Sequence, residues 1–418
     1  MSATISFPSI KTLLARKRVH QTVVLYISLL VSLLLGISVS VINTRLLGPQ
    51  AFGDFKFLQT IWTVGVSFVT FGFFSTGGTL LARHTSRSSE RNLMGSLLVI
   101  ACGVAVLFTV VMAVLSYPIG YVYGHELGGK MRLYSAFVFV FPLQLYLQEV
   151  LRGANDITNL ALFNALPQLL YIPAALAVNR LTGFSLDIAL LLYLLGMAVA
   201  TVIIVIRSKP GFGGLGPGIR EVFESNRVLG LHIFIAMLMT NASTHLSQFS
   251  LAYFCDTRLV GIFSLALTIT LPLTMIPNAI STTFFKQFAS QDHMPAKVIW
   301  ATWGISLTTL VGFLAVIRMI ILKLYTAQFI EVVPFAYICA VGAILHGVGD
   351  VYNRYLLSHG KTRILRTNAF QLAMISVVGY LFLVAWLGIS GAAITKLLVD
   401  IVYLATMFLY YKKRHMSG

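Results

Sequence analysis

Apolar runs of about 20 residues recur along the whole chain, and they constrain its fold more than any single motif does. A helix needs about 20 apolar residues to cross the hydrocarbon core of a bilayer. Inside a membrane a segment must also satisfy its own backbone hydrogen bonds, which favours helices. The runs lie near 21–44, 57–82, 93–117, 133–151, 160–179, 186–206, 228–254, 259–285, 298–322, 332–353, 368–388 and 390–411. The sequence predicts an all-α polytopic membrane protein with 12 transmembrane helices.

Composition and charge agree with a membrane protein. Hydrophobic residues make up 57% of the chain and charged residues 10%, against roughly 25% charged in soluble proteins. The net charge of +17 does not indicate nucleic acid, because the cations sit in short gaps between apolar runs. The three cysteines, Cys102, Cys255 and Cys339, show no paired metal spacing. We therefore expect no nucleic-acid partner, no metal and no other cofactor.

The distribution of Lys and Arg predicts the orientation. If the chain starts in the cytoplasm, most of the 30 Lys and Arg residues fall in cytoplasmic segments. Cytoplasmic loops of membrane proteins carry such an excess of cations. We expect a multi-pass protein with both termini in the cytoplasm.

An internal repeat divides the runs into halves. Landmarks at corresponding span boundaries recur at shifts of 208 or 207 positions: Gly53 and Gly261, Tyr117 and Tyr325, Gly153 and Gly360, Gly183 and Gly391. Because each half has an even number of spans, the repeat is parallel, as in transporters built from two bundles. The sequence predicts two six-helix lobes around a central cleft. The expected parts are a basic cytoplasmic tail (1–20), an N-lobe (21–206), a flexible cytoplasmic linker (207–227), a C-lobe (228–411) and a second cytoplasmic tail (412–418).

Polar side chains recur at helical spacing inside two of the runs. In the first run a face of small residues leads through Ser40 to Asn43, and in the seventh Asn241, His245 and Gln248 form a stripe. Such faces can serve close helix packing, because small residues let backbones approach in lipid. The larger amides and His245 suit packing less well. We interpret these faces as walls of a wetted cleft.

Ionisable residues inside the runs are the strongest candidates for function, because they are costly in hydrocarbon and usually face inward. Lys396 and Asp400 are four residues apart and share a helix face, with Asp400 near the midplane. His346, Asp350 and Arg354 are also four apart. A self-neutralising ion pair that holds helices together is the competing interpretation.

Four further cations are expected near the membrane interfaces: Arg45, Lys56, Lys286 and Arg318. Snorkelling of the charged head group to the interface is the main alternative for each of them.

Three stretches give the chain a family resemblance. "NTRLLGPQAFGDF", with Arg45, Gly48 and Gly53, resembles the end of the first helix in bacterial polysaccharide flippases. "LVGIFSLALTITLPLTMIPNAISTTFFKQFA" is similar to their seventh-to-eighth span region, and "LSHGKTR" to their tenth-span exit. These are Wzx-type O-antigen transporters of the multidrug/oligosaccharidyl-lipid/polysaccharide exporter superfamily.

The resemblance implies a V-shaped pair of lobes that moves undecaprenyl-diphosphate-linked oligosaccharide to the outer leaflet of the bacterial inner membrane. Expected partners are this lipid-linked oligosaccharide and membrane lipid, with a polysaccharide polymerase and a chain-length regulator as further candidates. The candidate cleft residues are Ser40, Arg45, Lys56, Asn241, His245, Gln248, Lys286, Arg318 and Lys396. Asp400, Asp350, His346 and Arg354 are candidates for coupling or ion pairing. Lys396 and Arg45 are expected to attract the diphosphate.

Two other function classes compete with the flippase. A cation-coupled multidrug antiporter of the same superfamily would require carboxylates deep in the N-lobe for coupling. Glu149 and Asp156 flank an inner loop, and Asp54 and Asp187 lie at outer ends, so the first half offers none at depth. A sugar polymerase or ligase would need catalytic loops outside the bilayer, and the loops here are short. We expect that the protein is not an enzyme.

Overall fold

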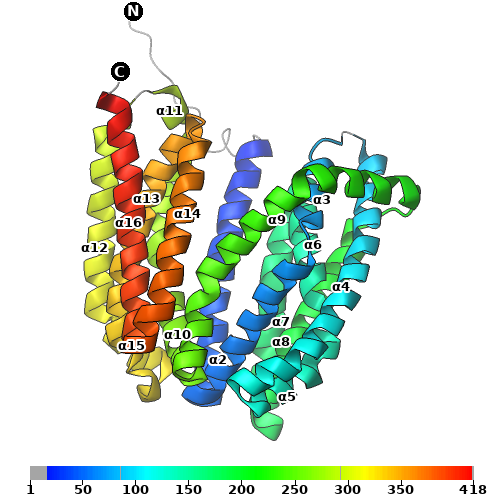
Figure 1. The fold of residues 1–418 in the computed structure, drawn as a ribbon, viewed down its shortest axis with the longest axis horizontal. Coiled ribbons are helices and arrows are strands. Elements are labelled where there is room, and N and C mark those ends of the chain that lie inside the picture. The colour runs from blue at the N-terminus through cyan, green and yellow to red at the C-terminus, as the bar shows by residue number, and fades with distance from the viewer. Residues whose placement is uncertain (1–16, 85, 292, 417–418) are drawn as a thin grey trace, which may run out of the picture.

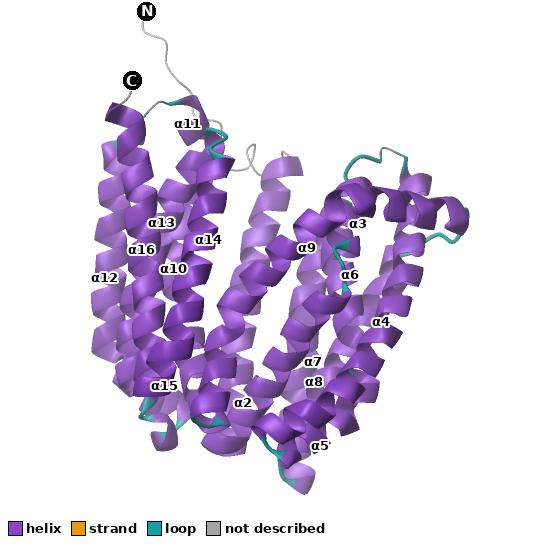
Figure 2. Cartoon of the chain, viewed as in Figure 1, coloured by secondary structure: helices purple, strands orange, loops and turns teal. Residues whose placement is uncertain are grey.

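The computed structural model describes residues 17–84, 86–291 and 293–416. Within these ranges only the backbone is described for residues 17–26, 229, 231, 242, 286, 362, 363 and 414–416. Every regular element in this part of the chain is a helix and none is a strand (Figure 2). The helical membrane architecture predicted from the apolar runs is confirmed.

The helices follow the predicted runs closely. The first half contains α2 (Lys17–Val69), α3 (Phe73–Leu81), α4 (Arg87–Tyr123), α5 (His125–Tyr134), η1 (Ser135–Phe137), α6 (Val140–Gly153), α7 (Ile157–Thr182) and α8 (Leu186–Ser208). The second half contains α9 (Leu215–Phe254), α10 (Thr257–Thr283), α11 (Phe285–Ser290), α12 (Ala296–Ile320), η2 (Ile321–Tyr325), η3 (Ala327–Phe329), α13 (Val332–Ser358), α14 (Thr362–Val378), η4 (Gly379–Leu383), α15 (Val384–Leu387) and α16 (Ile389–Met416). The segments η2 and η4 are π-helical.

The number of spans depends on how the broken helices are counted. In the described chain, 9 helices are long and apolar enough to cross a membrane, or 11 if each of two bent pairs forms one span. Helix α2 has 53 residues, more than twice the ~20 that one crossing needs. Because Gly48 interrupts its helical geometry, α2 supplies two spans, in agreement with the predicted twelve.

Gly48 and Pro49 form the turn inside α2. Gly48 has φ 72° and ψ 175°, a conformation that glycine adopts without steric cost. Pro49 then suits the start of the second arm, since it lacks an N–H that the first helical turn would leave unbonded. Figure 1 shows the chain reversing its direction at this point.

The outer surface carries large apolar side chains of the kind that face lipid. On α4, Val106, Val110 and Val114 are 66%, 54% and 61% exposed and are four residues apart. Trp300 and Trp386 are exposed to 75% and 83%. A soluble monomer rarely exposes such continuous apolar stripes, whereas a bilayer covers them at no cost.

The helices form two lobes. In Figure 1, α10 and α12–α16 lie on one side, α3–α8 lie on the other, and α9 runs between them. The lobes touch where α2 turns, because a Cβ built on Gly53 of α2 would lie 2.0 Å from the carbonyl oxygen of Thr257, at the start of α10. They diverge toward the end where α2 starts and α16 ends (Figure 1). The helices of the two lobes are thus closer together at the turn of α2 than at this other end.

The predicted linker, 207–227, is largely helical, although the sequence suggests a flexible, solvated segment. Its only non-helical part is 209–214, and the first arm of α9, Leu215–Val228, is bent by 71° from the next arm. This arm lies on the N-lobe, where a Cβ built on Gly218 would be 2.3 Å from Ser96 Oγ. Val222 is fully buried while Arg220 is exposed, so amphipathicity fixes the arm to α4.

Candidate functional site

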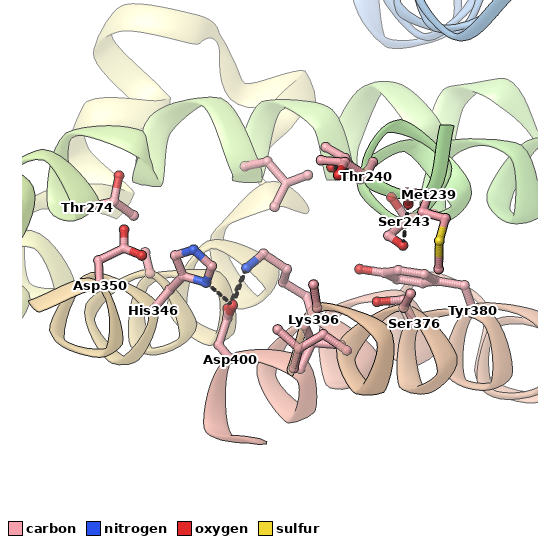
Figure 3. A pocket seen from close by; sticks show the side chains of 18 of the residues that line it. Met239, Thr240, Ser243, Thr274, His346, Asp350, Ser376, Tyr380, Lys396 and Asp400 are labelled. Atoms are coloured by element: carbon pink, nitrogen blue, oxygen red, sulfur yellow. Dashed lines mark hydrogen bonds and ion pairs between the residues drawn. The ribbon is translucent and has the colours of Figure 1, made fainter. Parts of the chain in front are cut away.

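A cavity of about 1010 Å³ lies between α9 and the helices of the C-lobe. Side chains from α9, α10, α13, α14 and α16 line it, and Figure 3 shows them in close view. Its volume is at the upper end of the ~300–1,000 Å³ range of small-molecule sites. All lining residues come from the second half of the chain.

Lys396, Asp400 and His346 form a charged cluster on the cavity wall (Figure 3). Lys396 Nζ donates to both carboxylate oxygens of Asp400, at 2.6 and 2.5 Å. His346 Nδ1, from α13, lies 3.0 Å from Asp400 Oδ1. The spacing of four residues on α16 creates the first contact, and the packing of α13 against α16 creates the second.

The three groups differ in exposure. The Asp400 side chain is 0% exposed, whereas those of Lys396 and His346 are 28% and 39% exposed. The Asp400 carboxylate therefore lies behind the nitrogen groups of Lys396 and His346, and of the Lys396–Asp400 pair it is the ammonium that faces the cavity. A carboxylate buried at this depth is tolerated because it is paired.

Gly342 makes room for this carboxylate. A Cβ built on Gly342 of α13 would lie 2.5 Å from Asp400 Oδ2. Only glycine at this position lets α13 approach the charged cluster this closely.

Asp350 belongs to a second polar cluster, one turn along α13. Tyr403 Oη donates to Asp350 Oδ1 at 2.6 Å and accepts from Asn353 Nδ2 at 2.7 Å. The Tyr403 ring stacks on His346, with centroids 4.6 Å apart. Tyr403 thus contacts both polar clusters, through its ring at His346 and through its hydroxyl at Asp350. Arg354 is not among the residues that line the cavity.

The rest of the wall is rich in hydroxyl groups. Thr240, Ser243 and Thr244 of α9 each donate to the carbonyl oxygen four residues earlier, at 2.8–2.9 Å. Thr270 of α10 donates to the carbonyl oxygen of Ala266, four residues earlier, and Thr274 donates to that of Leu271, three residues earlier. Their oxygens keep lone pairs that can accept hydrogen bonds from a ligand.

The stripe predicted on α9 lies on a different face from these hydroxyls. Asn241 Nδ2 donates to Ser67 Oγ of α2 at 2.7 Å. Gln248 is 8% exposed and accepts from Ser247, and His245 is partly buried. None of the three lines the cavity, and Asn241 joins α9 to the N-lobe.

The remaining predicted residues whose side chains are described lie apart from the cavity. Arg45 donates from Nε to the Leu324 carbonyl oxygen at 2.6 Å, and its Nη2 donates to that of Lys323. Lys56 contacts Gln59 at 3.5 Å, Ser40 is 3% exposed, and Arg318 is exposed on α12. Lys286 lies on α11, and its side chain is outside the described residues.

The structure adds lining residues that sequence reasoning missed. Arg366, Ser376 and Tyr380 come from α14 and η4, and Cys339 from α13. Ser376 and Tyr380 are four apart within an apolar run, which is a usable helical signal. No group of three or more His, Cys, Asp or Glu that could hold a metal occurs in the described residues.

Comparison with solved structures defines the class of the fold. Lipid II flippase MurJ in an inward closed conformation is similar with a TM-score of 0.74 at 14% identity, covering 93% of this chain and 87% of that chain. The MATE multidrug transporter DinF-BH is similar with a TM-score of 0.65 at 15% identity, covering 97% and 96%. An outward-facing MATE transporter of the MOP superfamily gives 0.62 at 17% identity, covering 96% and 95%. The chain therefore has the two-lobed fold of this transporter superfamily.

The sequence places the chain more narrowly within that class. A family described as polysaccharide biosynthesis protein matches residues 19–288, more than half of the chain. The protein belongs to this polysaccharide biosynthesis family. The sequence matches none of the curated proteins with which it was compared.

Proposed function

We propose that the protein flips an undecaprenyl-diphosphate-linked oligosaccharide, such as an O-antigen repeat unit, from the inner to the outer leaflet of the bacterial cytoplasmic membrane by alternating access. Membership of the polysaccharide biosynthesis family supports this substrate class. The observation that carries the proposal is the cavity wall, where Lys396 is exposed to the cavity and its partner Asp400 is fully buried.

The cavity chemistry suits both polar parts of such a substrate. A diphosphate cannot cross hydrocarbon without compensating charge, and the ammonium of Lys396 supplies it. The Ser and Thr hydroxyls on α9 and α10 can accept hydrogen bonds from sugars without demanding one sugar structure. The polyprenyl tail can stay in the lipid outside the lobes.

Asp400 acts in this scheme as the group that holds and tunes Lys396. Buried carboxylates and lysines in transporters commonly pair and carry function. When the diphosphate arrives it competes with Asp400 for the Lys396 ammonium, and when it leaves the pair re-forms. His346, which contacts the same carboxylate, keeps Asp400 hydrogen-bonded during that exchange.

The membrane orientation follows from the same proposal. With the cation-rich end in the cytoplasm, both termini are cytoplasmic, and the end at which the two lobes diverge faces the cytoplasm (Figure 1). A polysaccharide polymerase and a chain-length regulator would then act on the product at the outer face.

A cation-coupled multidrug antiporter is the second candidate, favoured by the similarity to MATE transporters. Among the described N-lobe carboxylates, Asp54 bonds Gln50 and Thr257 near the turn of α2, and Glu149 pairs with Arg152 at the end of α6. Neither lies on the cavity wall, whose charged residues are Lys396, Arg366, Asp350 and Asp400. Because Asp400 is buried, the charge of the pair that faces the cavity is the Lys396 ammonium, and Asp350 on the same wall is hydrogen-bonded to Tyr403. An exposed ammonium suits a diphosphate better than an organic cation, so the flippase is the better account.

The test replaces Lys396 in the producing strain. Lys396→Gln leaves the buried Asp400 without its ammonium partner, so surface polysaccharide is compared at equal amounts of folded protein in the membrane. On that basis it is expected to fall at least tenfold, and Lys396→Arg is expected to retain part of the activity. The matched control is Lys323→Gln, an exposed lysine outside the cavity. Full polymer with Lys396→Gln would overturn the proposal, and drug hypersensitivity with normal polysaccharide on deletion would favour the antiporter.

A further inference from the structure

A second polar pocket, of about 690 Å³, lies in the N-lobe and shares no residue with the cavity described above. Three segments form it: the start of α4, the connection from α6 to α7, and the end of α8. This end of the lobe is the predicted cytoplasmic one. The pocket is therefore open to groups at the inner membrane surface.

Cations from two of these segments line the pocket, namely Arg87, Arg91, Arg207 and Lys209. The carboxylates on its wall are Glu90 and Asp156. Asp156 already accepts two hydrogen bonds from Asn159, at 3.1 Å from its backbone N–H and 2.6 Å from Nδ2. The balance of the wall is cationic.

Arg91 and Arg207 are each held in place by a hydrogen bond from the Nε atom of the guanidinium group. Arg91 Nε donates to the Lys209 carbonyl oxygen at 2.6 Å, and Arg207 Nε donates to Asn159 Oδ1 at 3.0 Å. A guanidinium has five N–H donors, and the terminal nitrogens of these two make no hydrogen bond to another described residue. The side chains are ordered and still have donors to offer.

An independent feature also points to a missing acceptor or donor. The Oγ atom of Ser208, on the pocket wall, is shielded from solvent and has no hydrogen-bond partner among the described residues. The N-terminus of α7, a helix of 26 residues, contributes Ile157 and Thr158 to the same wall. Because the Asp156 carboxylate caps this N-terminus, the donors left for a ligand are those of the arginines, Lys209 and Ser208.

From this geometry we propose that the pocket binds a phosphate group at the inner membrane surface. A planar guanidinium can donate two parallel hydrogen bonds to two oxygens of one phosphate. Lys209 adds an ammonium charge on a flexible side chain. The phosphate can come from an anionic phospholipid headgroup or from a free phosphate compound. The proposal does not depend on what the C-lobe cavity transports.

The experiment uses the full-length protein purified in detergent. Binding of phosphatidylglycerol is measured by native mass spectrometry, with phosphatidylcholine as the zwitterionic comparison, and binding of inorganic pyrophosphate is measured by calorimetry. The pocket variant is R87Q/K209Q, which leaves the held side chains Arg91 and Arg207 intact. The control is R83Q/R227Q, which removes two exposed cations outside the pocket.

At least one probe is expected to bind the native protein. Its affinity should fall about 25-fold in R87Q/K209Q, since each cation near an anionic group contributes a factor of about five. It should change less than twofold in R83Q/R227Q. Binding of phosphatidylglycerol alone supports a lipid source, and binding of pyrophosphate supports a free one. Absence of both, or equal losses in the two double variants, overturns the site. If R87Q/K209Q does not fold, R87Q alone should lower affinity about fivefold.

Discussion

A Cβ built on Gly261 would lie 2.8 Å from the Cα of Gly53, and these are the two glycines that the internal repeat pairs in sequence. Gly53 belongs to the second arm of α2 and Gly261 to the first turns of α10. A contact between equivalent positions is what a two-fold relationship between halves produces. The lobes meet here backbone to backbone, at the end where α2 turns.

This contact predicts that a methyl group at Gly53 shifts the protein away from the present conformation. A Cβ there would be 2.0 Å from the Thr257 carbonyl oxygen, and no side-chain rotation relieves a backbone clash. Overpacking costs about 1–3 kcal/mol, which changes a conformational ratio about 5- to 150-fold.

The measurement labels a single cysteine, Ser243→Cys in the cavity, with a membrane-impermeant maleimide added outside the cell. In a background without native cysteines, labelling should rise in Gly53→Ala. Gly103→Ala on α4 is the matched control, because a Cβ at Gly103 meets nothing within 4 Å. Equal labelling of the two variants would show that the glycine contact does not hold the lobes closed.

Arg45 should support the same closure. It lies near the end of the first α2 arm and donates to the carbonyl oxygens of Lys323 and Leu324, which lie near the end of the π-helical segment after α12. Cations bonded to the last carbonyls of a helix are stabilising. A hydrogen bond to a charged group contributes about 1.5–3 kcal/mol, so Arg45→Gln should raise outside labelling about tenfold or more.

Arg45→Lys should give an intermediate result, because an ammonium keeps the charge and loses the planar fork. Arg318→Gln, at an exposed position on α12, serves as the control. If Arg45→Gln labels no more than Arg318→Gln does, the cross-lobe bonds are not a latch.

The sequence predicts those features that depend on spacing along one helix. Run length gives the spans, and the four-residue spacing gives the contact between Lys396 and Asp400. The contact of His346 with Asp400 joins α13 to α16, so no spacing within one helix reveals it. The helical segment 215–227 was missed because its glycines suggest a turn, while burial of Val222 on α4 decides the outcome.

The polar stripe on α9 shows that the sequence predicts which residues share a helix face more readily than which helix packs against that face. Asn241 has the polar, intramembrane character expected of a cleft residue, and its spacing defines a face correctly. Which helix packs on that face depends on the crossing of α9 over α2, which turns Asn241 toward Ser67. The adjacent face, with Thr240 and Ser243, lines the cavity instead.

Loss of the Asp400 charge should destabilise the protein, and loss of both charges should not. Asp400→Asn leaves Lys396 without its carboxylate, and breaking a buried pair costs about 3–5 kcal/mol. Folded protein in the membrane should fall severalfold. In the double variant Lys396→Met/Asp400→Asn the amount of folded protein should recover while surface polysaccharide stays low. Normal polysaccharide in the double variant would remove the pair from the transport mechanism.

The close approach of Gly342 to Asp400 gives a test that leaves every charge in place. In Gly342→Ala the new methyl group would lie 2.5 Å from Asp400 Oδ2, so the carboxylate must move relative to Lys396 and His346. This overpacking is expected to destabilise the protein by about 1–3 kcal/mol.

Gly312→Ala on α12 is the matched control, since its Cβ would meet nothing within 4 Å and the gain in helix propensity is the same. Surface polysaccharide and melting temperature should both fall in Gly342→Ala and stay normal or rise slightly in Gly312→Ala. Because both changes add one methyl group to a transmembrane helix, a difference between them measures the contact at Asp400. Equal behaviour would mean that the cluster tolerates displacement of its carboxylate, so that the cationic face does not depend on the geometry seen here.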